Sequence, residues 1–163
     1  MVARDQSREH QSGMSTAPTV RPMQPADLPE TLDMWVAAWQ KAYPAIDFSA
    51  RRGWATNHFA ELERTGSRSF VAVDAGRIVG ALVVNPETGY LDQLVVATTH
   101  QNRGVATLLI AQAHALAPRG LELHVNQDNA GAIRFYERRG FAVTGEDVNL
   151  RSGAAIFRMS WRP

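Results

Sequence analysis

Apolar residues at helical or strand-like spacing follow one another in blocks along this chain. Between Asp27 and Pro44 they recur every three or four positions, which predicts an amphipathic helix with Asp27 as its N-cap and Pro29 in its first turn. The segment 47–64 predicts a second helix. The apolar positions of the first helix are Leu32, Trp35, Val36 and Trp39.

The rest of the chain predicts strands separated by turns, with two further helices. Asn129 is expected to cap the start of the last helix, and Gly140 to end it in the left-handed conformation. The order of these elements predicts an α/β (α+β) fold in which helices pack around a mixed sheet. Strands are expected at 19–23, 69–74, 78–84, 90–96, 121–125, 141–143 and 155–161, and helices at 104–116 and 130–139.

Length and composition narrow the range of functions. The 163 residues suit one domain, expected at residues 18–163 after a polar, poorly ordered segment 1–17. Residues 1–13 read as an extension or a mis-assigned start, without the apolar run of a secretory signal. A net charge of +1 gives no general attraction to nucleic acid or to an anionic membrane, and no apolar run is long enough to span a bilayer.

The residue types also limit the chemistry. The absence of cysteine excludes disulfides, thiolate metal sites and a cysteine nucleophile, and it fits a reducing compartment such as the cytoplasm. The five histidines are dispersed without metal-ligand spacing, so no metal is expected.

The segment 94–109 is the most informative local pattern. An apolar strand runs through a polar turn into a helix, so several backbone N–H groups face one cup at the positive end of the helix dipole. Such a cup binds phosphate, and the small residues Gly104 and Ala106 leave room for close approach. The spacing matches neither a P-loop nor a dinucleotide-binding loop. An ordinary strand–turn–helix joint would produce a similar pattern.

Two segments carry a family resemblance. The motif Gln101-x-x-Gly104-x-Ala106 resembles the Q/R-x-x-G-x-G/A signature of the GNAT superfamily of acyl-CoA-dependent N-acyltransferases. Residues 129–141 are similar to its second signature, N-x-x-A-x-x-F-Y-x-x-x-G-F. The two occur in the family order, each after a strand. The resemblance covers residues 18–163, the first half through its element order alone.

The resemblance implies a fold, a reaction and a cofactor. The fold is a mixed sheet whose central parallel strands splay apart. The reaction is transfer of an acetyl group from acetyl-CoA to a primary amine of a small molecule or peptide, by direct attack. Arg103 either reaches a phosphate or is solvated. The backbone N–H of Val95 or of Val96 is the expected donor to the oxyanion. The implied cofactor-binding residues are Leu94, Val95, Val96, Gln101, Asn102, Arg103, Gly104, Val105, Ala106, Thr107, Asn129, Ala132 and Tyr136.

The catalytic assignments leave alternatives open. Tyr136 either protonates the leaving thiolate or only packs. The resemblance implies Asp92, two residues before the cofactor-binding stretch, as the first choice of general base. Glu122 and His124 are the alternatives, of which His124 has the better-placed pKa.

The resemblance also implies that the first two helices and nearby loops supply the acceptor site. Trp39, Tyr43 and Asp47 are expected to bind the substrate, since aromatic rings with one carboxylate suit a cationic amine. The same tryptophans at helical spacing also suit a core.

Two rival functions are a non-catalytic acyl-CoA-binding module and a nucleic-acid or partner-binding protein. The absence of a basic stripe speaks against the second. An exposed strand edge in the closing hairpin offers a surface for a homodimer.

Overall fold

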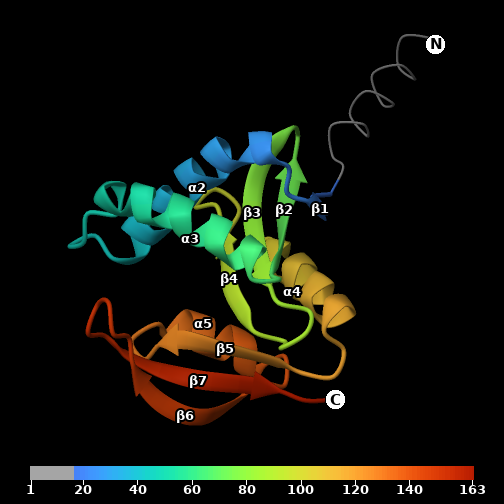
Figure 1. Cartoon of the computed structure of the whole chain (residues 1–163), viewed down its shortest axis with the longest axis vertical. Coiled ribbons are helices and arrows are strands. Elements are labelled where there is room, and N and C mark those ends of the chain that lie inside the picture. The colour runs from blue at the N-terminus through green and yellow to red at the C-terminus, as the bar shows by residue number, and fades with distance from the viewer. Residues whose placement is uncertain (1–16) are drawn as a thin grey trace, which may run out of the picture.

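The computed structural model describes residues 17–163, so the predictions for residues 1–13 and for nearly all of the segment 1–17 lie outside the described residues. The described chain alternates helices and strands, as Figure 1 shows. The strands are β1 (Thr19–Pro22), β2 (Arg68–Asp74), β3 (Arg77–Val84), β4 (Leu91–Val96), β5 (Leu121–Asn126), β6 (Ala142–Val148) and β7 (Ala155–Trp161). The helices are α2 (Leu28–Ala42), α3 (Arg52–Arg64), α4 (Val105–Leu116) and α5 (Ala130–Glu137), with short 3₁₀ turns η1 (Pro25–Asp27) and η2 (Ser49–Arg51).

The strands form two antiparallel sheets, with the orders β1-β2-β3-β4 and β5-β7-β6. They meet at a parallel bridge between Tyr90 and Glu122, just before β4 and within β5. Beyond that bridge β4 and β5 diverge (Figure 1). The predicted α/β fold is confirmed, but the predicted mixed sheet is divided into two antiparallel sheets that one parallel bridge joins at the splayed pair. The splay leaves the outer edge of β4 without a neighbouring strand.

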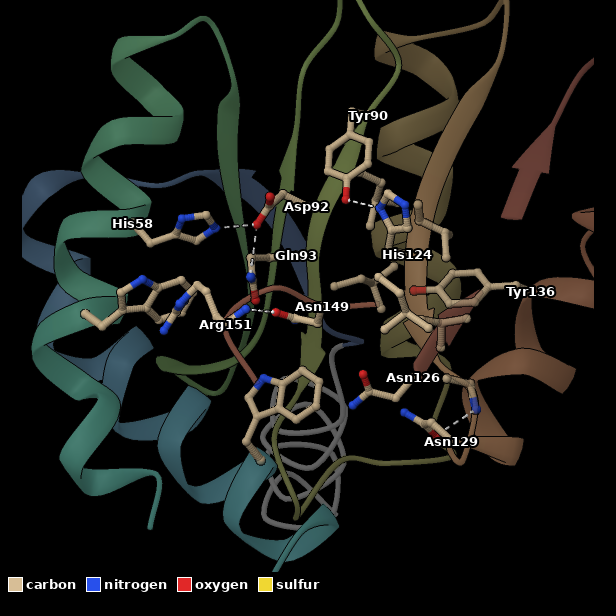
Figure 2. Close-up of a pocket in the computed structure, with 18 residues that line it drawn as sticks. His58, Tyr90, Asp92, Gln93, His124, Asn126, Asn129, Tyr136, Asn149 and Arg151 are labelled. Atoms are coloured by element: carbon tan, nitrogen blue, oxygen red, sulfur yellow. Dashed lines mark hydrogen bonds and ion pairs between the residues drawn. The ribbon is translucent and has the colours of Figure 1, made fainter. Parts of the chain in front are cut away.

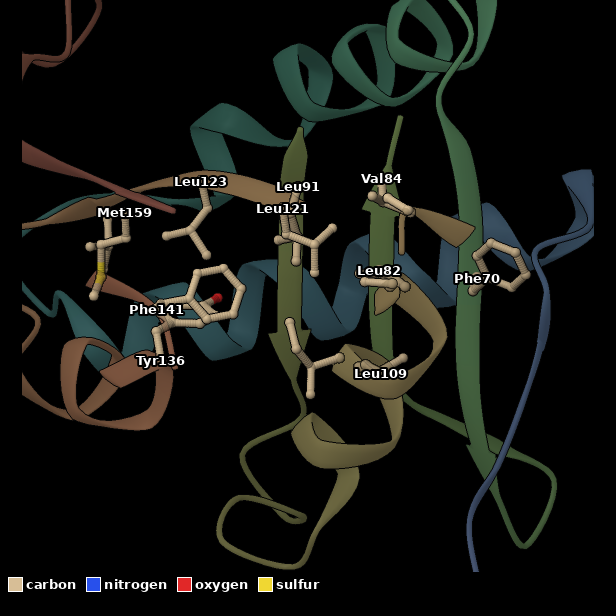
Figure 3. Close-up of a cluster of buried hydrophobic side chains, with 14 of the residues drawn as sticks. Phe70, Leu82, Val84, Leu91, Leu109, Leu121, Leu123, Tyr136, Phe141 and Met159 are labelled. Carbon is tan, nitrogen blue, oxygen red and sulfur yellow. The ribbon is translucent and has the colours of Figure 1, made fainter. Parts of the chain in front are cut away.

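Helices cover both faces of the first sheet because β3 is apolar on both. Its residues Leu82 and Val84 pack on the α4 side, whereas Ala81 and Val83 pack against the cluster of α2 and α3. The α4-side core continues from Phe70 and Leu82 into Leu123 and Met159 of the second sheet (Figure 3). One hydrophobic core thus joins the two sheets on either side of the splay.

Gly80 lets α4 approach β3 closely. A Cβ atom there would lie 2.9 Å from Cγ1 of Val105 and 3.0 Å from Cδ1 of Leu109. The absence of a side chain at Gly80 therefore places the first turn of α4 directly over β3, beside the end of β4.

Three local predictions needed correction. The helix predicted over 47–64 is the turn η2 followed by α3. The strand predicted over 141–143 extends to Val148, because an exposed edge strand tolerates the polar residues that resemble a loop. The Asp27 carboxylate does not cap α2, since it instead accepts hydrogen bonds from Arg21 and from the backbone of Gln24. The cap at Asn129 and the left-handed Gly140 are confirmed.

Candidate active site

Three cavities form one continuous trough along the open edge of β4. The central cavity, of about 340 Å³, is lined by His58, Asp92, His124 and Tyr136 among others. It shares Tyr136 with a cavity of about 750 Å³ at the starts of α4 and α5. At the other end it shares Trp39, Trp54, Gln93, Asn126, Asn149 and Arg151 with a cavity of about 710 Å³ beside α2.

The loop before α4 presents free amides to the first of these cavities. Asn102 and Gly104 have φ angles of +61° and +84°, and a Cβ on Gly104 would meet nothing within 4 Å. The N–H of Leu108 donates to the carbonyl of Gly104, so the three earlier amides of α4 have no partner within the helix. These amides and the helix dipole suit a pyrophosphate.

The side chains around this loop differ in whether they line the cavity. Arg139 donates a hydrogen bond to the Thr107 hydroxyl and, with Arg134 and Arg138, lines the cavity. The exposed Arg103 does not line it, which favours the solvated alternative. The side chain of Val105 is buried in the core, so this residue offers only its backbone amide.

The direction of the backbone amides distinguishes Val95 from Val96. The N–H of Ala97 donates to Val79 of β3 at 2.8 Å. Since successive amides along a strand point to opposite edges, the N–H of Val95 also points to β3, whereas those of Leu94 and Val96 point to the open edge. Val96 is therefore the oxyanion donor that the geometry favours.

Asp92 lies at a β-bulge. Gln93 pairs with Val83 and Leu91 with Val84, so Asp92 has no partner on β3. Its Oδ1 lies 2.7 Å from Nε2 of His58 and accepts a hydrogen bond of 3.1 Å from Nε2 of Gln93 (Figure 2). The Gln93 amide is in turn held by the Trp35 indole N–H. The carboxylate is thus fixed toward the central cavity, with a histidine from α3 beside it.

Tyr136 lies on the wall opposite His58 and Asp92 (Figure 2). Its side chain is 8% exposed, and no hydrogen bond joins its hydroxyl to another described residue. Burial raises the pKa of this phenol well above its ordinary value, so the hydroxyl keeps its proton. About two turns earlier, Asn129 caps α5 through Oδ1, which leaves its amide NH₂ for a ligand.

Comparison with known proteins identifies the family. A family model described as the Acetyltransferase (GNAT) family matches residues 28–141. The chain belongs to the GNAT acetyltransferase family.

Individual relatives agree with this assignment. The chain is 36% identical over 118 residues to a peptidyl-lysine N-acetyltransferase, YjaB of Salmonella typhimurium, covering 68% of this chain and 76% of that protein. It is 37% identical over 105 residues to streptothricin acetyltransferase of Streptomyces lavendulae, but spans only 56% of that protein's length while using 59% of its own. The PaiA N-acetyltransferase of Thermoplasma acidophilum, solved with coenzyme A, has the same fold, with a TM-score of 0.75 at 14% identity and coverage of 91% and 100%.

The protein is therefore an acetyl-CoA-dependent N-acetyltransferase, as the two signatures predicted. The loop before α4, with its free amides and its open space at Gly104, fits the pyrophosphate of acetyl-CoA. Within residues 17–163 no cluster of three metal-ligating side chains occurs. No helix in this part of the chain has the length and apolarity needed to cross a membrane.

The two alternative bases of this GNAT protein lie differently. His124 lines the central cavity, where its Nδ1 lies 2.7 Å from the Tyr90 hydroxyl. Partial burial, helped by the charges of Asp92 and Glu122, raises the pKa of Tyr90 to about 12. The Glu122 side chain lines none of the three cavities, and its backbone N–H donates to Gly89.

The third cavity has aromatic walls. Trp39 stacks on Tyr43, and both line this cavity. The Tyr43 hydroxyl donates to Asp128 at 2.8 Å and accepts from Asn126 at 2.9 Å. These bonds tie α2 to the loop after β5, across the trough.

One predicted acceptor residue is misplaced. Asp47 is exposed and lines neither this cavity nor the central one, because it precedes η2 and its carboxylate accepts a hydrogen bond from Ala50. The loop between β6 and β7 takes its place, with Asn149 and Arg151. Nothing local in the sequence marks that loop, since only tertiary packing brings it over the trough.

Proposed function

We propose that this enzyme acetylates a primary amine of a small molecule or peptide, with Asp92 as the general base. The observation that carries this proposal is the Asp92–His58 pair at the β4 bulge, which faces Tyr136 across the central cavity. An amine entering from the aromatic cavity would meet the pair before it reached the cofactor side of the trough.

Each residue then has one task. An amine is protonated at neutral pH, so the Asp92–His58 pair takes one proton and frees the nitrogen lone pair. The nitrogen attacks the thioester carbon, and the N–H of Val96 stabilises the resulting oxyanion. As the carbon–sulfur bond breaks, the Tyr136 hydroxyl gives its proton to the thiolate. The nitrogen, positively charged after its attack, releases its second proton, and this proton restores the Tyr136 hydroxyl. The products are the amide, the free thiol and the one proton held by the Asp92–His58 pair.

Calorimetric titration of acetyl-CoA and CoA, followed by a thiol-release screen over a panel of amines, tests this function. We expect Asp92→Asn to lower kcat by about 10²- to 10⁴-fold, the usual contribution of a general base, with CoA affinity unchanged. Glu122→Gln is the matched control and should turn over at the wild-type rate, because its side chain lines none of the three cavities.

The outcomes separate the alternatives. Binding of CoA without turnover of any amine would favour a non-catalytic acyl-CoA-binding module. Equal losses in Asp92→Asn and Glu122→Gln would reject Asp92 as the base.

We also propose that the protein forms a homodimer through β6. This strand is the outer edge of the second sheet and is exposed along its length. It carries the exposed apolar residues Val143 and Val148, and Leu150 follows at 98% exposure. An open strand edge with apolar side chains favours pairing with a second copy.

A further inference from the structure

Two arginines line the acceptor cavity beside α2. Arg51 precedes α3, and Arg151 belongs to the loop between β6 and β7. Within the described residues, neither guanidinium forms an ion pair or a side-chain hydrogen bond, unlike Arg21, Arg52 and Arg64, each of which lies against a carboxylate. The hydrogen-bond donors of both lining arginines are therefore available to a ligand.

Aromatic rings hold both guanidinium groups in place. The Cζ atom of Arg151 lies 3.4 Å from the centre of the Trp54 ring, and that of Arg51 lies 5.0 Å from the centre of the Phe48 ring. Stacking fixes the plane of a guanidinium and leaves its N–H groups at the rim. The two arginines thus lie against aromatic rings and present donors to one cavity from two separate elements.

The charges around this cavity favour an anion. Asp128 is the one acidic residue among its lining side chains, and its Oδ1 already accepts the Tyr43 hydroxyl. Two arginines and one carboxylate give the side chains that line this cavity a net positive charge. A wholly cationic acceptor, which the aromatic walls alone suggested, would be repelled here, because one carboxylate opposes two guanidinium groups.

The same stack connects the arginine to the catalytic pair. Trp54 stacks on Arg151, and the His58 ring stacks on Trp54 at 4.5 Å and 17°. His58 in turn contacts Asp92. Figure 2 shows Arg151, His58 and Asp92 on the same wall of the trough. An anion on Arg151 would therefore lie one aromatic ring away from the residues that receive the amine proton.

We propose that the acceptor is an amine that also carries a carboxylate, with Arg151 and Arg51 binding the carboxylate while the amine faces Asp92. A carboxylate matches the planar fork of a guanidinium in two parallel hydrogen bonds. The cavity of about 710 Å³ leaves room for an aromatic or long apolar side chain against Trp39. This inference rests on the proposed acetyl transfer to an amine and narrows its substrate to aminocarboxylates.

The test compares amines that share one side chain and differ in the group beside the amine. Thiol release is measured with L-phenylalanine, L-phenylalaninamide, and the aminophosphonate analogue of phenylalanine. We expect wild-type kcat/KM to favour the acid over the amide by at least about tenfold, or about 1.4 kcal/mol. Arg151→Gln and Arg51→Gln should each reduce that ratio toward one.

Arg68→Gln is the control variant. Arg68 also stacks on an aromatic ring, with its Cζ 5.4 Å from the centre of the Phe70 ring, but it lines none of the three cavities. It should keep the wild-type ratio. An acid-to-amide ratio near one in the wild type, or a ratio that Arg151→Gln leaves unchanged, would overturn the inference while the acetyl transfer itself stood. A strong preference for the phosphonate would overturn the assignment to a carboxylate.

A second measurement does not depend on turnover. The affinities of N-acetyl-L-phenylalanine and its amide are measured by tryptophan fluorescence, since Trp39 and Trp54 line the cavity. We expect tighter binding of the acid, which is lost in Arg151→Gln and kept in Arg68→Gln. Equal affinities for acid and amide would reject the anion site even if no amine were acetylated, so failure of this inference is distinguishable from failure of the proposed reaction.

Discussion

Asp92 owes its place in the site to a bulge and to a histidine 34 residues earlier in the chain. The sequence marked Asp92 as a base because it precedes the cofactor-binding stretch of β4. His58 becomes its partner only when α3 packs over the first sheet. Gln93 completes the arrangement, because it links Asp92 to the buried indole of Trp35.

Tyr136 allows a direct test at the residue scale. We expect Tyr136→Phe to lower kcat by about 10²-fold, because the mutant cannot protonate the thiolate, while CoA affinity is retained. Since burial raises the pKa of Tyr136, its ionisation should not lower wild-type kcat below about pH 10, the ordinary phenol value. A pH profile of thiol release checks both statements. Unchanged kcat in the mutant would leave Tyr136 with a packing role only.

At the scale of elements, α4 serves both the core and the cofactor. Because Gly80 has no side chain, the first turn of α4 packs directly against β3. The left-handed conformation of Gly104 turns the preceding loop so that the free amides face the trough. Glycine at the second position is needed because φ is +84°, a region that costs other residues about 1–2 kcal/mol.

Gly104→Ala tests this dependence. We expect CoA binding to weaken by up to about tenfold, the equivalent of 1.4 kcal/mol, as the loop relaxes from its left-handed conformation. Titration calorimetry measures the loss. Gly53→Ala is the control, since it lies in α3 without a positive φ and with nothing within 4 Å of the added Cβ. Equal affinities in both variants would contradict the role of Gly104.

We expect His114 on α4 to make stability depend on pH. Its ring packs edge-on against Trp161, its Nδ1 is buried without a partner among the described residues, and burial lowers its pKa. The unfolded chain therefore binds a proton more readily than the folded one, so stability should fall as pH drops below about 6.5, the ordinary histidine pKa. Urea unfolding of wild type and His114→Phe between pH 5 and 7.5 checks this. A slope that the substitution leaves unchanged would assign the effect to another group.

At the scale of the whole molecule, the site exists because the two sheets touch at one bridge and then diverge. The α4-side core holds them together behind the trough, and the Tyr43 hydroxyl links the end of α2 to the end of β5 and the loop after it, across the trough. The cofactor side, the catalytic pair and the acceptor cavity therefore occupy one gap in the fold.

The homodimer prediction also belongs to this scale. We expect light scattering to give twice the 18.0 kDa mass of one chain, and Val148→Lys to shift the protein toward the monomer because it places a charge on the β6 edge. Leu108→Lys, at an exposed apolar position on α4, is the control. A monomer at all concentrations would contradict the proposal.

The sequence by itself determined the family, the cofactor and most of the elements. Those properties depend on local patterns: the amides after β4 follow from a strand–turn–glycine–helix order, and the Asn129 cap and Gly140 end follow from neighbouring residues. The same patterns placed Tyr136 on the cofactor-facing side of α5.

Only the tertiary structure decided the proton acceptor's surroundings and the acceptor cavity. The bulge at Asp92 depends on pairing with β3, and its contact with His58 depends on how α3 packs. Arg151 reaches Trp54 because the loop between β6 and β7 of the second sheet packs against α3. Such contacts join residues far apart in the chain, and their spacing carries no local signal.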